Sequence, residues 1–476
     1  MNQQPLGWGN PTLLDCSQFV RGVTYTKSDA TDRSASGLIP IVRANNIQAR
    51  GFELQNLVYV PASLVSAEQV LKCGDVVIAT SSGSISVVGK AAQVRREQPM
   101  SFGAFCGVLR PSSTINARYF GHFFSSKAYR DAVSEMARGV NINNLKRDHF
   151  QAINIPLAPL AEQKRIADKL DTILARVDAV NTRLARVAPI LKRFRQSVLA
   201  AATSGRLTED WRRSNADWAM HSQWLQRNNE SDPPPDINSL NVPSTWRILR
   251  AQDVVESDAN IVYGIVQPGP KLVSGIPYVQ TTDIADGRIQ VGSLCRTSVD
   301  IANRYHRSSI KGGDVLLGII RATKVAVVPD ELSGGNISRS VARLRPCSDM
   351  VPQFLAIVLE SPAVQDWFRA QHRGMDMPVL NLAQVRLAPL PIAPIEEQRE
   401  IVRRVETLFA FADRLEACLL TAQTATDRLT PALLAKAFRG ELVPQDPNDE
   451  PASELLRRLQ QEAPSTSTRR GRKSAV

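Results

Sequence analysis

The sequence lacks the features that mark membrane, secreted and metal-binding proteins. No apolar run in its 476 residues approaches the ~20 residues needed to cross a bilayer. The first five residues lack the basic and apolar regions of a secretory signal. The six cysteines and five histidines are scattered, without a CxxC pair or metal-ligand spacing. We therefore expect a cytoplasmic protein without a disulfide framework or a metal site.

Recognisable catalytic motifs are missing as well. The segment from Gly83 to Ala91 is similar to a phosphate loop, but it has one residue too many between its glycines, and Ala91 replaces the hydroxyl residue that binds magnesium. Glu162-Gln163-Lys164 has a nuclease-like spacing but no acidic partner nearby, so we interpret it as a helix start. There is no Asn-Pro-Pro-aromatic tetrad of the amino-methyltransferases and no glycine-rich cofactor loop. We expect no catalytic residues and no cofactor in this chain.

What the sequence does have is positive charge and length. The net charge is +12 and the isoelectric point is about 9.6, which favours a polyanionic partner such as nucleic acid. Part of this charge lies in the tail Arg469–Lys473. A chain of this length predicts two or three domains.

The chain is an internal duplication. The segment Leu157–Ile166 recurs as Ile392–Ile401, which places Glu162 and Glu397 at an offset of 235 residues. Other matches follow in the same order, and they are Gly74–Ile78 with Gly313–Leu317, Pro40–Ile47 with Pro277–Ile284, Trp8 with Trp246, and Gly205-Arg206-Leu207 with Gly440-Glu441-Leu442. The ordered set predicts two halves of one plan.

Each half begins with a mixed α/β region. Short β-branched runs such as Asp75–Thr80 are broken by Gly and Ser, as strands and turns are. We expect one short helix over 117–136 and its counterpart over 352–369. Pro156 and Pro159 end this region in the first half.

A long helix follows each region. Apolar residues recur in alternating steps of four and three, which is the seam of a coiled coil. Each helix spans about 40 residues, on the order of 60 Å. Gly205 and Gly440 stand where C-terminal caps belong, and Pro189 and Pro431 should bend or break the helices. The residues expected to pair the helices are Ile166, Leu170, Ile173, Val177, Val180 and Leu184 with Ile401, Val405, Leu408, Leu415 and Leu419.

The simplest partner for each seam is the other copy. In the order domain, helix, domain, helix, the second helix must return along the first, so the pair is antiparallel with a pseudo-two-fold axis. The alternative is that each helix packs on its own domain or on another protein. The expected fold class is α/β (α+β), with two globular domains separated by two long antiparallel helices in a pseudo-two-fold tandem repeat.

These residues together resemble those of the specificity subunits of type I restriction-modification systems. The resemblance rests on the repeated Pro-x-x-Glu-Gln-x-x-Ile junction, the Gly-Asp-Val-hydrophobic strand and the Gly-x-Leu helix ends, and it spans nearly the whole chain. The tracts Arg138–Leu145 and Arg373–Leu382 also fit. This chain departs from the family in its short leader before Trp8, which leaves its first strand less well supported.

The resemblance implies two target recognition domains, each reading one half of a split DNA site, with the helices setting the spacer. It implies two DNA methyltransferase subunits and two endonuclease subunits as partners, which would hold S-adenosylmethionine, ATP and magnesium. The expected boundaries are 1–160 for the first recognition domain, 161–205 for the central helix, 206–245 for a linker, 246–395 for the second recognition domain, 396–440 for the second helix and 441–476 for a C-terminal segment with a basic tail. Three linker tryptophans, Trp211, Trp218 and Trp224, suggest that the linker docks on something.

Base reading needs forked or amide donors, with Arg for guanine and Asn or Gln for adenine, and some candidates will contact only phosphate. In the first copy the candidates are Arg43, Asn45, Ser81, Ser82, Ser84, Lys90, Arg138, Asn141, Asn143 and Lys146. In the second copy they are Gln280, Thr282, Arg321, Lys324, Arg339, Arg373 and Asn381. The alternatives to a specificity subunit are a stand-alone DNA-binding regulator, an unrecognised nuclease, and a coiled-coil scaffold that never touches DNA.

Overall fold

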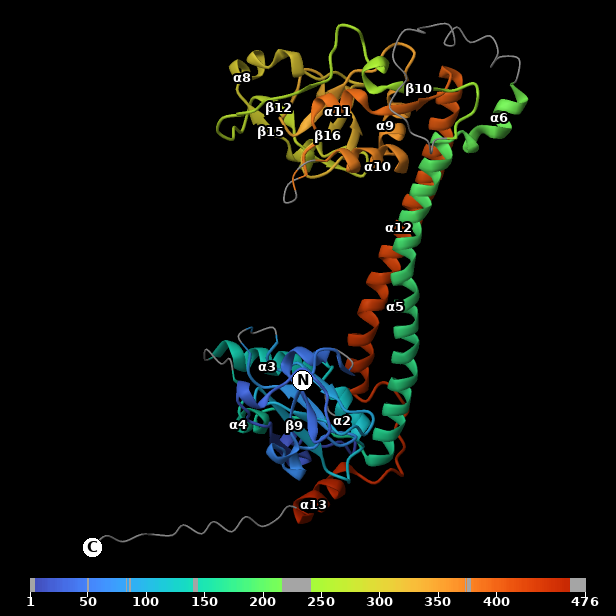
Figure 1. Cartoon of the computed structure of the whole chain (residues 1–476). Coiled ribbons are helices and arrows are strands. Elements are labelled where there is room, and N and C mark those ends of the chain that lie inside the picture. The colour runs from blue at the N-terminus through green and yellow to red at the C-terminus, as the bar shows by residue number, and fades with distance from the viewer. Residues whose placement is uncertain are drawn as a thin grey trace. The chain divides into compact units, whose positions relative to one another are not determined.

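The computed structural model divides the chain into two compact units. It describes residues 5–48, 51–82, 84, 87–139, 144–215, 241–372, 374 and 378–462. Unit 1 combines Met1–Leu184 with Thr421–Val476, and unit 2 is Ala185–Leu420. Each unit therefore contains one globular region, one end of the first long helix and one end of the second (Figure 1).

Unit 1 is built on two small sheets and a hairpin. The four-stranded sheet has the order β1-β9-β6-β7, all antiparallel, and the three-stranded sheet has the order β5-β2-β8, with β8 parallel to β2. The strands are β1 Ser17–Arg21, β2 Leu38–Val42, β3 Ile47–Gln48, β4 Gly51–Phe52, β5 Val58–Pro61, β6 Val76–Ala79, β7 Ala91–Gln93, β8 Ser101–Phe102 and β9 Cys106–Pro111.

The central strand β6 is buried on both faces. Because successive side chains point to opposite faces of a strand, Val76 and Ile78 join the helical core, whereas Val77 and Ala79 join a second core against the three-stranded sheet. An unbroken apolar run is what such a strand requires, and the strand predicted over Asp75–Thr80 is confirmed.

Unit 2 repeats this topology. Its four-stranded sheet has the order β11-β19-β16-β17 and its three-stranded sheet the order β15-β12-β18. An additional pair, β10-β20, has a four-residue ladder, whereas the corresponding part of unit 1 has only the isolated bridges Gly9–Leu157 and Thr12–Asn154. The strands are β10 Arg247–Arg250, β11 Val262–Tyr263, β12 Ile276–Val279, β13 Ile284–Ala285, β14 Arg288–Ile289, β15 Cys295–Thr297, β16 Val315–Gly318, β17 Val325–Val327, β18 Asn336–Ile337, β19 Val341–Leu344 and β20 Pro389–Ile392.

Helices cover one face of each four-stranded sheet. The single helix expected over 117–136 is two helices, α2 Ala117–Phe123 and α3 Lys127–Gly139, and its counterpart is α9 Pro352–Glu360 and α10 Pro362–Gln371. Pro362 explains the second break, because its ring cannot continue a helix. The shorter helices are α1 Leu13–Cys16, α4 Arg147–Gln151, α6 Glu209–Ser214, α8 Val299–Arg304, α11 Leu382–Leu387 and α13 Ala452–Glu462.

The two long helices are α5 Leu160–Thr203 and α12 Ile395–Ala437. Pro189 and Pro431 lie inside them, and neither proline breaks its helix. Gly205 and Gly440 follow the ends with φ values of 74° and 75°, the left-handed conformation of a C-terminal cap. Within the described residues, no helix combines the length and the apolarity needed to cross a membrane.

In each unit the ends of α5 and α12 lie side by side and run antiparallel (Figure 1). In unit 1, Ile166 and Leu170 share a core with Leu434, Ala437 and Phe438. In unit 2, the later part of α5 shares a core with Ile401 and Val405. Each long helix is therefore held at both of its ends by a globular region.

The predicted seam is buried only in part. Val177 and Leu419 are also buried, and Ile173, Leu184 and Leu408 are half-buried. Val180 and Leu415 are exposed at 44% and 39%, so they lack the burial of the other seam positions, and their role in pairing the helices stays a prediction. A strict seven-residue repeat drifts by about 20° per heptad on a straight helix, which turns some seam positions away from the neighbouring helix.

Two of the predicted segments contain further helical structure. Residues 206–214, at the start of the region predicted as a linker, form a 3-10 turn and α6. Of its tryptophans, Trp218 and Trp224 lie outside the described residues. The C-terminal segment predicted over 441–476 contains α13, which buries Leu455 and Leu459 in the core of unit 1.

Candidate nucleic-acid interface

The repeated Glu-Gln motif anchors each long helix to its globular region. The Glu162 carboxylate accepts a hydrogen bond from the Trp8 indole (2.9 Å), and Glu397 accepts one from Trp246 (2.8 Å). Both carboxylates are at least 98% buried. The interpretation of Glu162 as part of a helix start missed this contact, although the paired tryptophans were a visible signal. The motif is structural in both units.

The adjacent glutamines also make equivalent hydrogen bonds in the two units. Gln163 donates to the carbonyl of Ala158 (2.8 Å) and accepts from the amide of Asn116 (3.0 Å). Gln398 donates to the carbonyl of Ala393 (2.8 Å) and accepts from the amide of Val351 (2.8 Å). A glutamine with both ends engaged fixes the angle at which the helix leaves its domain.

The Gly-Asp-Val motif sets the entry to each central strand. Gly74 and Gly313 have φ values of 97° and 85°, which L-residues with side chains rarely adopt. Asp75 is then buried and receives both prongs of Arg110, at 2.7 Å each. The equivalent pair in unit 2 is Asp314 with Arg345, at 2.7 and 2.9 Å. The paired charges make the buried carboxylates tolerable.

In unit 1, four segments meet at one end of the sheets. The amide of Gly103 donates to Val42 (3.0 Å), which joins the end of β2 to the β8–β9 turn. The amides of Thr80 and Ser81 donate to Phe105 (2.9 and 3.1 Å), which joins that turn to the β6–β7 loop. The amide of Leu145 donates to Thr80 (2.6 Å) and adds the segment after α3.

This convergence brings five predicted residues together. An open cleft of about 920 Å³ is lined by Arg43, Asn45, Ser81, Ser82 and Lys90. The other lining residues that sequence reasoning missed include Tyr25, Gln48 and Phe105, and Phe105 is 69% exposed. An aromatic side chain exposed beside amide and cationic groups is suited to a base edge or a thymine methyl group.

Some unit 1 candidates have other partners or lie elsewhere. One prong of Arg43 donates to the carbonyl of Asn56 (3.0 Å), which fixes its orientation. Ser84 is exposed next to Ser82. Lys146 precedes α4, and its side chain is exposed. Asn141, Asn143 and the side chain of Arg138 lie outside the described residues.

Unit 2 brings the equivalent segments together. The amide of Ile319 donates to Ser340 (2.9 Å), and the amide of Leu380 donates to Ile319 (2.8 Å). Thr281 joins through its hydroxyl, which donates to the carbonyl of Ser340 (2.6 Å). At the tips of these segments Thr282, Arg321, Lys324 and Arg339 are exposed, and Gln280 is half-buried.

Arg321 has an unusual backbone conformation. Its φ is 69°, in the left-handed region, and its amide donates to the carbonyl of Pro378 (2.8 Å). The left-handed conformation is energetically unfavourable for a residue with a side chain, and such strain often marks functional positions. Asn381 has a local role instead, because its side chain accepts from the amide of Ala383 (3.1 Å) and caps α11. Arg373 lies outside the described residues.

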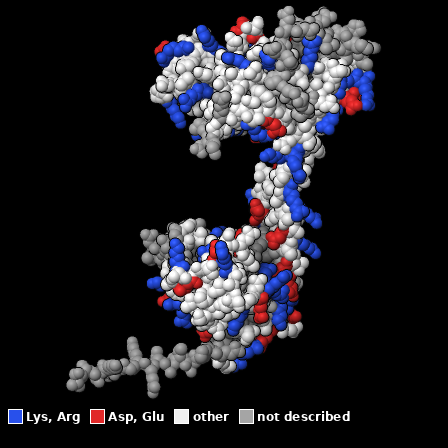
Figure 2. All heavy atoms as spheres, in the orientation of Figure 1, with Lys and Arg blue, Asp and Glu red and all other residues white. Residues whose placement is uncertain are grey.

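The surface agrees with a polyanionic partner. Figure 2 shows Lys and Arg side chains on the visible face of both units, with Asp and Glu interspersed mainly along the helices. Among the described residues there is no group of three His, Cys, Asp or Glu side chains placed to hold a metal ion.

Comparisons with known proteins follow the duplication. The family model of the type I restriction modification DNA specificity domain matches residues 5–188 and again 243–422. The chain is 36% identical over 450 residues to the StySPI specificity subunit of Salmonella potsdam, covering 93% of this chain and 90% of that protein. It is also 36% identical over 453 residues to the EcoKI specificity subunit of Escherichia coli K12, with the same coverage.

Solved structures agree on the fold. A chain from a structure of type I restriction-modification complex assembly aligns with a TM-score of 0.68 at 19% identity, covering 92% of this chain and 100% of that one. The HsdS subunit from Thermoanaerobacter tengcongensis aligns with a TM-score of 0.54 at 19% identity, covering 92% and 98%. With its duplicated domain and its similarity over nearly the whole length of these relatives, the chain belongs to the family of type I restriction-modification DNA specificity subunits.

Proposed function

We propose that this chain reads an asymmetric bipartite DNA site, one half with each unit, and directs adenine methylation and DNA cleavage by partner subunits. The main observation in support of this proposal is that the same four segments converge in both units but present different side chains. Unit 1 offers Arg43, Asn45, Lys90 and Phe105, whereas unit 2 offers Gln280, Arg321, Lys324 and Arg339. Two different readers on one duplicated fold suit two different half-sites.

The chemistry belongs to other chains in this proposal. Two methyltransferase subunits and two endonuclease subunits would assemble with this chain in the cytoplasm. They would carry S-adenosylmethionine, ATP and magnesium. The near-miss at Gly83–Ala91 supports this division, because the position after the lysine has no hydroxyl to bind magnesium.

The test is to map modified adenines after co-expression of this chain with the methyltransferase encoded beside it. A split motif with a fixed spacer is expected. An unsplit motif would contradict the proposal, and so would DNA cutting or methylation by the purified chain alone. Tight, specific binding without any partner would favour a stand-alone regulator.

The helices supply a second test. One heptad inserted into α5 alone should disrupt assembly, because the two ends of each helix are held in different units. Matched insertions into α5 and α12 should restore assembly and lengthen the spacer. An active double-insertion variant with an unchanged spacer would contradict the role of the helices as a ruler.

A further inference from the structure

The turn between β8 and β9 in unit 1 has an equivalent between β18 and β19 in unit 2. Residues 103–106 and 338–341 are separated by 235 positions, the offset of the duplication. One hydrogen bond closes each turn. It runs from the amide of Cys106 to the carbonyl of Gly103 (2.8 Å) and from the amide of Val341 to the carbonyl of Ser338 (3.1 Å). The two turns therefore share one backbone hydrogen-bond pattern.

Further hydrogen bonds tie each turn to the same neighbouring strand. The amide of Gly103 donates to Val42 at the end of β2 (3.0 Å), and the amide of Ser338 donates to Val279 at the end of β12 (2.9 Å). The carbonyl of the third turn residue accepts two more hydrogen bonds in each unit. Because both turns are held before any ligand binds, ordering them on binding costs little conformational entropy.

The two turns present different side chains. In unit 1 the tip residues are Ala104 and Phe105, which are both exposed. The equivalent residues in unit 2 are Arg339, which is exposed, and Ser340. The hydroxyl of Ser340 lies 2.8 Å from the hydroxyl of Ser338, so it bonds within its own turn. The same turn therefore offers an apolar ring in unit 1 and a guanidinium in unit 2.

The surroundings of the unit 1 turn suit DNA. The turn lines the cleft of about 920 Å³, together with the apolar side chains of Val23 and Val87. The charged residues of the cleft are Arg43 and Lys90, and no carboxylate is among its described lining residues. Cations can hold the phosphate backbone while an apolar ring contacts a base edge. Phe105 is thus placed where a base is expected.

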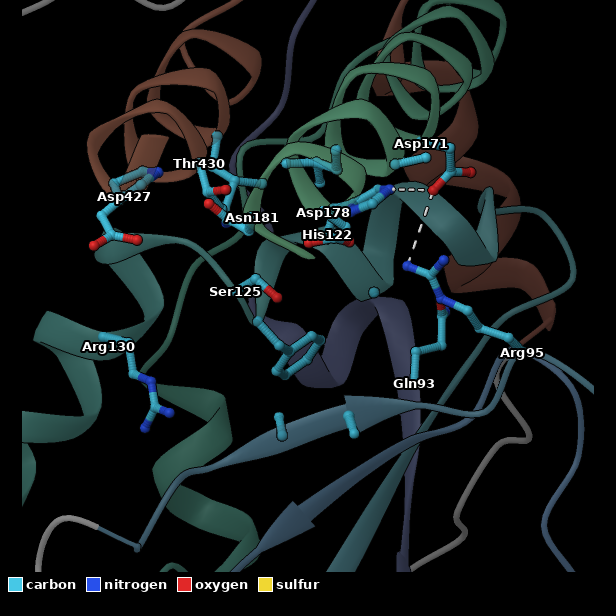
Figure 3. Close-up of a pocket in the computed structure, with 18 of the residues that line it drawn as sticks. Gln93, Arg95, His122, Ser125, Arg130, Asp171, Asp178, Asn181, Asp427 and Thr430 are labelled. Carbon is cyan, nitrogen blue, oxygen red and sulfur yellow. Dashed lines mark hydrogen bonds and ion pairs between the residues drawn. The ribbon is translucent and has the colours of Figure 1, made fainter. Parts of the chain in front are cut away.

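A second cavity of unit 1, beside α5 and α12, has a different character. Its volume is about 510 Å³, and Asp171, Asp178 and Asp427 are among its lining residues. Figure 3 shows His122 and Arg95 directed at Asp171, at distances of 2.9 and 4.0 Å. Carboxylates disfavour a DNA phosphate at the same place. The turn and its cleft are therefore the better DNA surface.

We propose that this turn determines one base pair of each half-site, by reading a thymine methyl group with Phe105 in unit 1 and a guanine with Arg339 in unit 2. The inference rests on the proposed function for the identity of the ligand. The thymine methyl group is the apolar group that base edges present in the major groove. Guanine presents O6 and N7 there, and these two acceptors match the planar fork of a guanidinium.

Base analogues that lack single groups test the two contacts. Deoxyuridine lacks the thymine methyl group, and 7-deazaguanine lacks the N7 acceptor. Methylation mapping first locates the half-sites, and the complex of this chain with the methyltransferase is then bound to duplexes that carry one analogue at a time. One deoxyuridine in the first half-site should weaken binding about fourfold, as expected for one buried methyl group. One 7-deazaguanine in the second half-site should weaken binding at least about fivefold.

Variants of the two side chains assign these effects. Phe105→Ser should bind thymine and deoxyuridine equally, whereas Phe105→Leu keeps an apolar group and should retain part of the preference for thymine. Arg339→Lys keeps the charge without the fork, so it should bind guanine and 7-deazaguanine equally. The conservative variants thus separate a base contact from a loss of charge or of folding.

Leu64 provides a matched control for Phe105. It is an exposed apolar residue (40%) that follows β5, whose Pro61 pairs with Leu38 at the end of β2 away from the cleft. Leu64→Ser should leave the preference for thymine unchanged. Ala104→Arg combined with Phe105→Ser copies the unit 2 turn into unit 1. Methylation mapping of this double variant should show guanine in place of thymine at one position of the first half-site.

Several results would overturn the proposal. Wild-type binding that no single deoxyuridine weakens would do so, and if Phe105→Ser still lowered affinity, the ring would act on DNA shape instead. Equal effects of Phe105→Ser and Leu64→Ser on the preference for thymine would also do so. Full sensitivity of Arg339→Lys to 7-deazaguanine would show that another residue reads that guanine. Failure of the proposed function is distinguishable, because the wild-type complex would then leave no split methylation motif.

Discussion

Replacing Arg321 with glycine should raise the stability of unit 2 and weaken its recognition of DNA. Its φ of 69° costs a residue with a side chain roughly 1–2 kcal/mol, and glycine avoids this cost. Glycine also gives the unfolded chain more conformational freedom, which offsets about 0.4–1 kcal/mol of the stability gained by relieving the strain. Relative to Arg321→Ala, which keeps the strain, Arg321→Gly should therefore raise the free energy of unfolding of unit 2 by about 0.5–1 kcal/mol.

The effect on DNA has the opposite sign. A forked arginine contact with guanine is worth about 1–3 kcal/mol of discrimination. Both Arg321→Gly and Arg321→Ala should thus lose roughly 5- to 150-fold in preference for the correct second half-site. Arg321→Lys keeps the charge but not the fork, so it should retain affinity for nonspecific DNA while losing that preference.

Urea denaturation of the isolated chain measures the first effect, and competition between correct and altered half-sites measures the second. Arg321→Phe retains a bulky side chain in the strained conformation and serves as a stability control. If Arg321→Gly is no more stable than Arg321→Ala, the backbone at this position carries no strain that glycine relieves. The assignment to base reading is refuted if Arg321→Lys keeps the full preference, because a phosphate contact would then suffice.

Three further predictions concern other parts of the chain. Burial, with a smaller contribution from Asp286, raises the pKa of Glu360 to about 7. The folded state therefore binds this proton more tightly than the unfolded state does. The resulting stabilisation of the protein should be fully present below pH ~4.5, and about 3 kcal/mol of it should be lost as the pH rises through 7. Glu360→Gln should flatten that loss in denaturation curves at pH 5 and 8, and an unchanged slope would contradict the shift. Asp314→Ala leaves the charge of Arg345 half-buried beside Arg343 and should cost about 3 kcal/mol of unfolding free energy, whereas a loss below about 1 kcal/mol would show that the pair is dispensable. Phe105→Ser, which copies Ser340 at the equivalent turn, should relax the first half-site in methylation mapping while leaving the second unchanged, and relaxation of both halves would argue for a folding defect.

Much of the architecture was readable in the sequence because repetition and periodicity are local properties. The offset between Glu162 and Glu397 predicted the duplication, and the β-branched run at Val76–Ala79 predicted the buried strand. The caps at Gly205 and Gly440 followed from the backbone freedom of glycine. The heptad pattern did not predict how deeply each position is buried, because tertiary packing decides this, as at Val180, which is 44% exposed.

The candidate interface was predictable only as a set of residue types. Arg43 follows β2, whereas Ser81 and Lys90 lie in the β6–β7 loop, and their meeting depends on how the two sheets pack. Phe105 carried no sequence signal, because an exposed and a buried phenylalanine look alike in a sequence. The hydrogen bond from Trp8 to Glu162 was missed although both residues recur in the second half, because a contact across 154 positions depends on the fold.

The sequence by itself determined the duplicated plan, the two long helices and the excess of positive charge, because these depend on composition and on spacing along the chain. Tertiary structure alone decided which loops converge to form a reading surface. It also decided that Arg195 joins α5 to α12 in unit 2 through Asp413 and Glu416. The physical reason is that a contact depends on distance in space, which the spacing of residues along the chain does not fix.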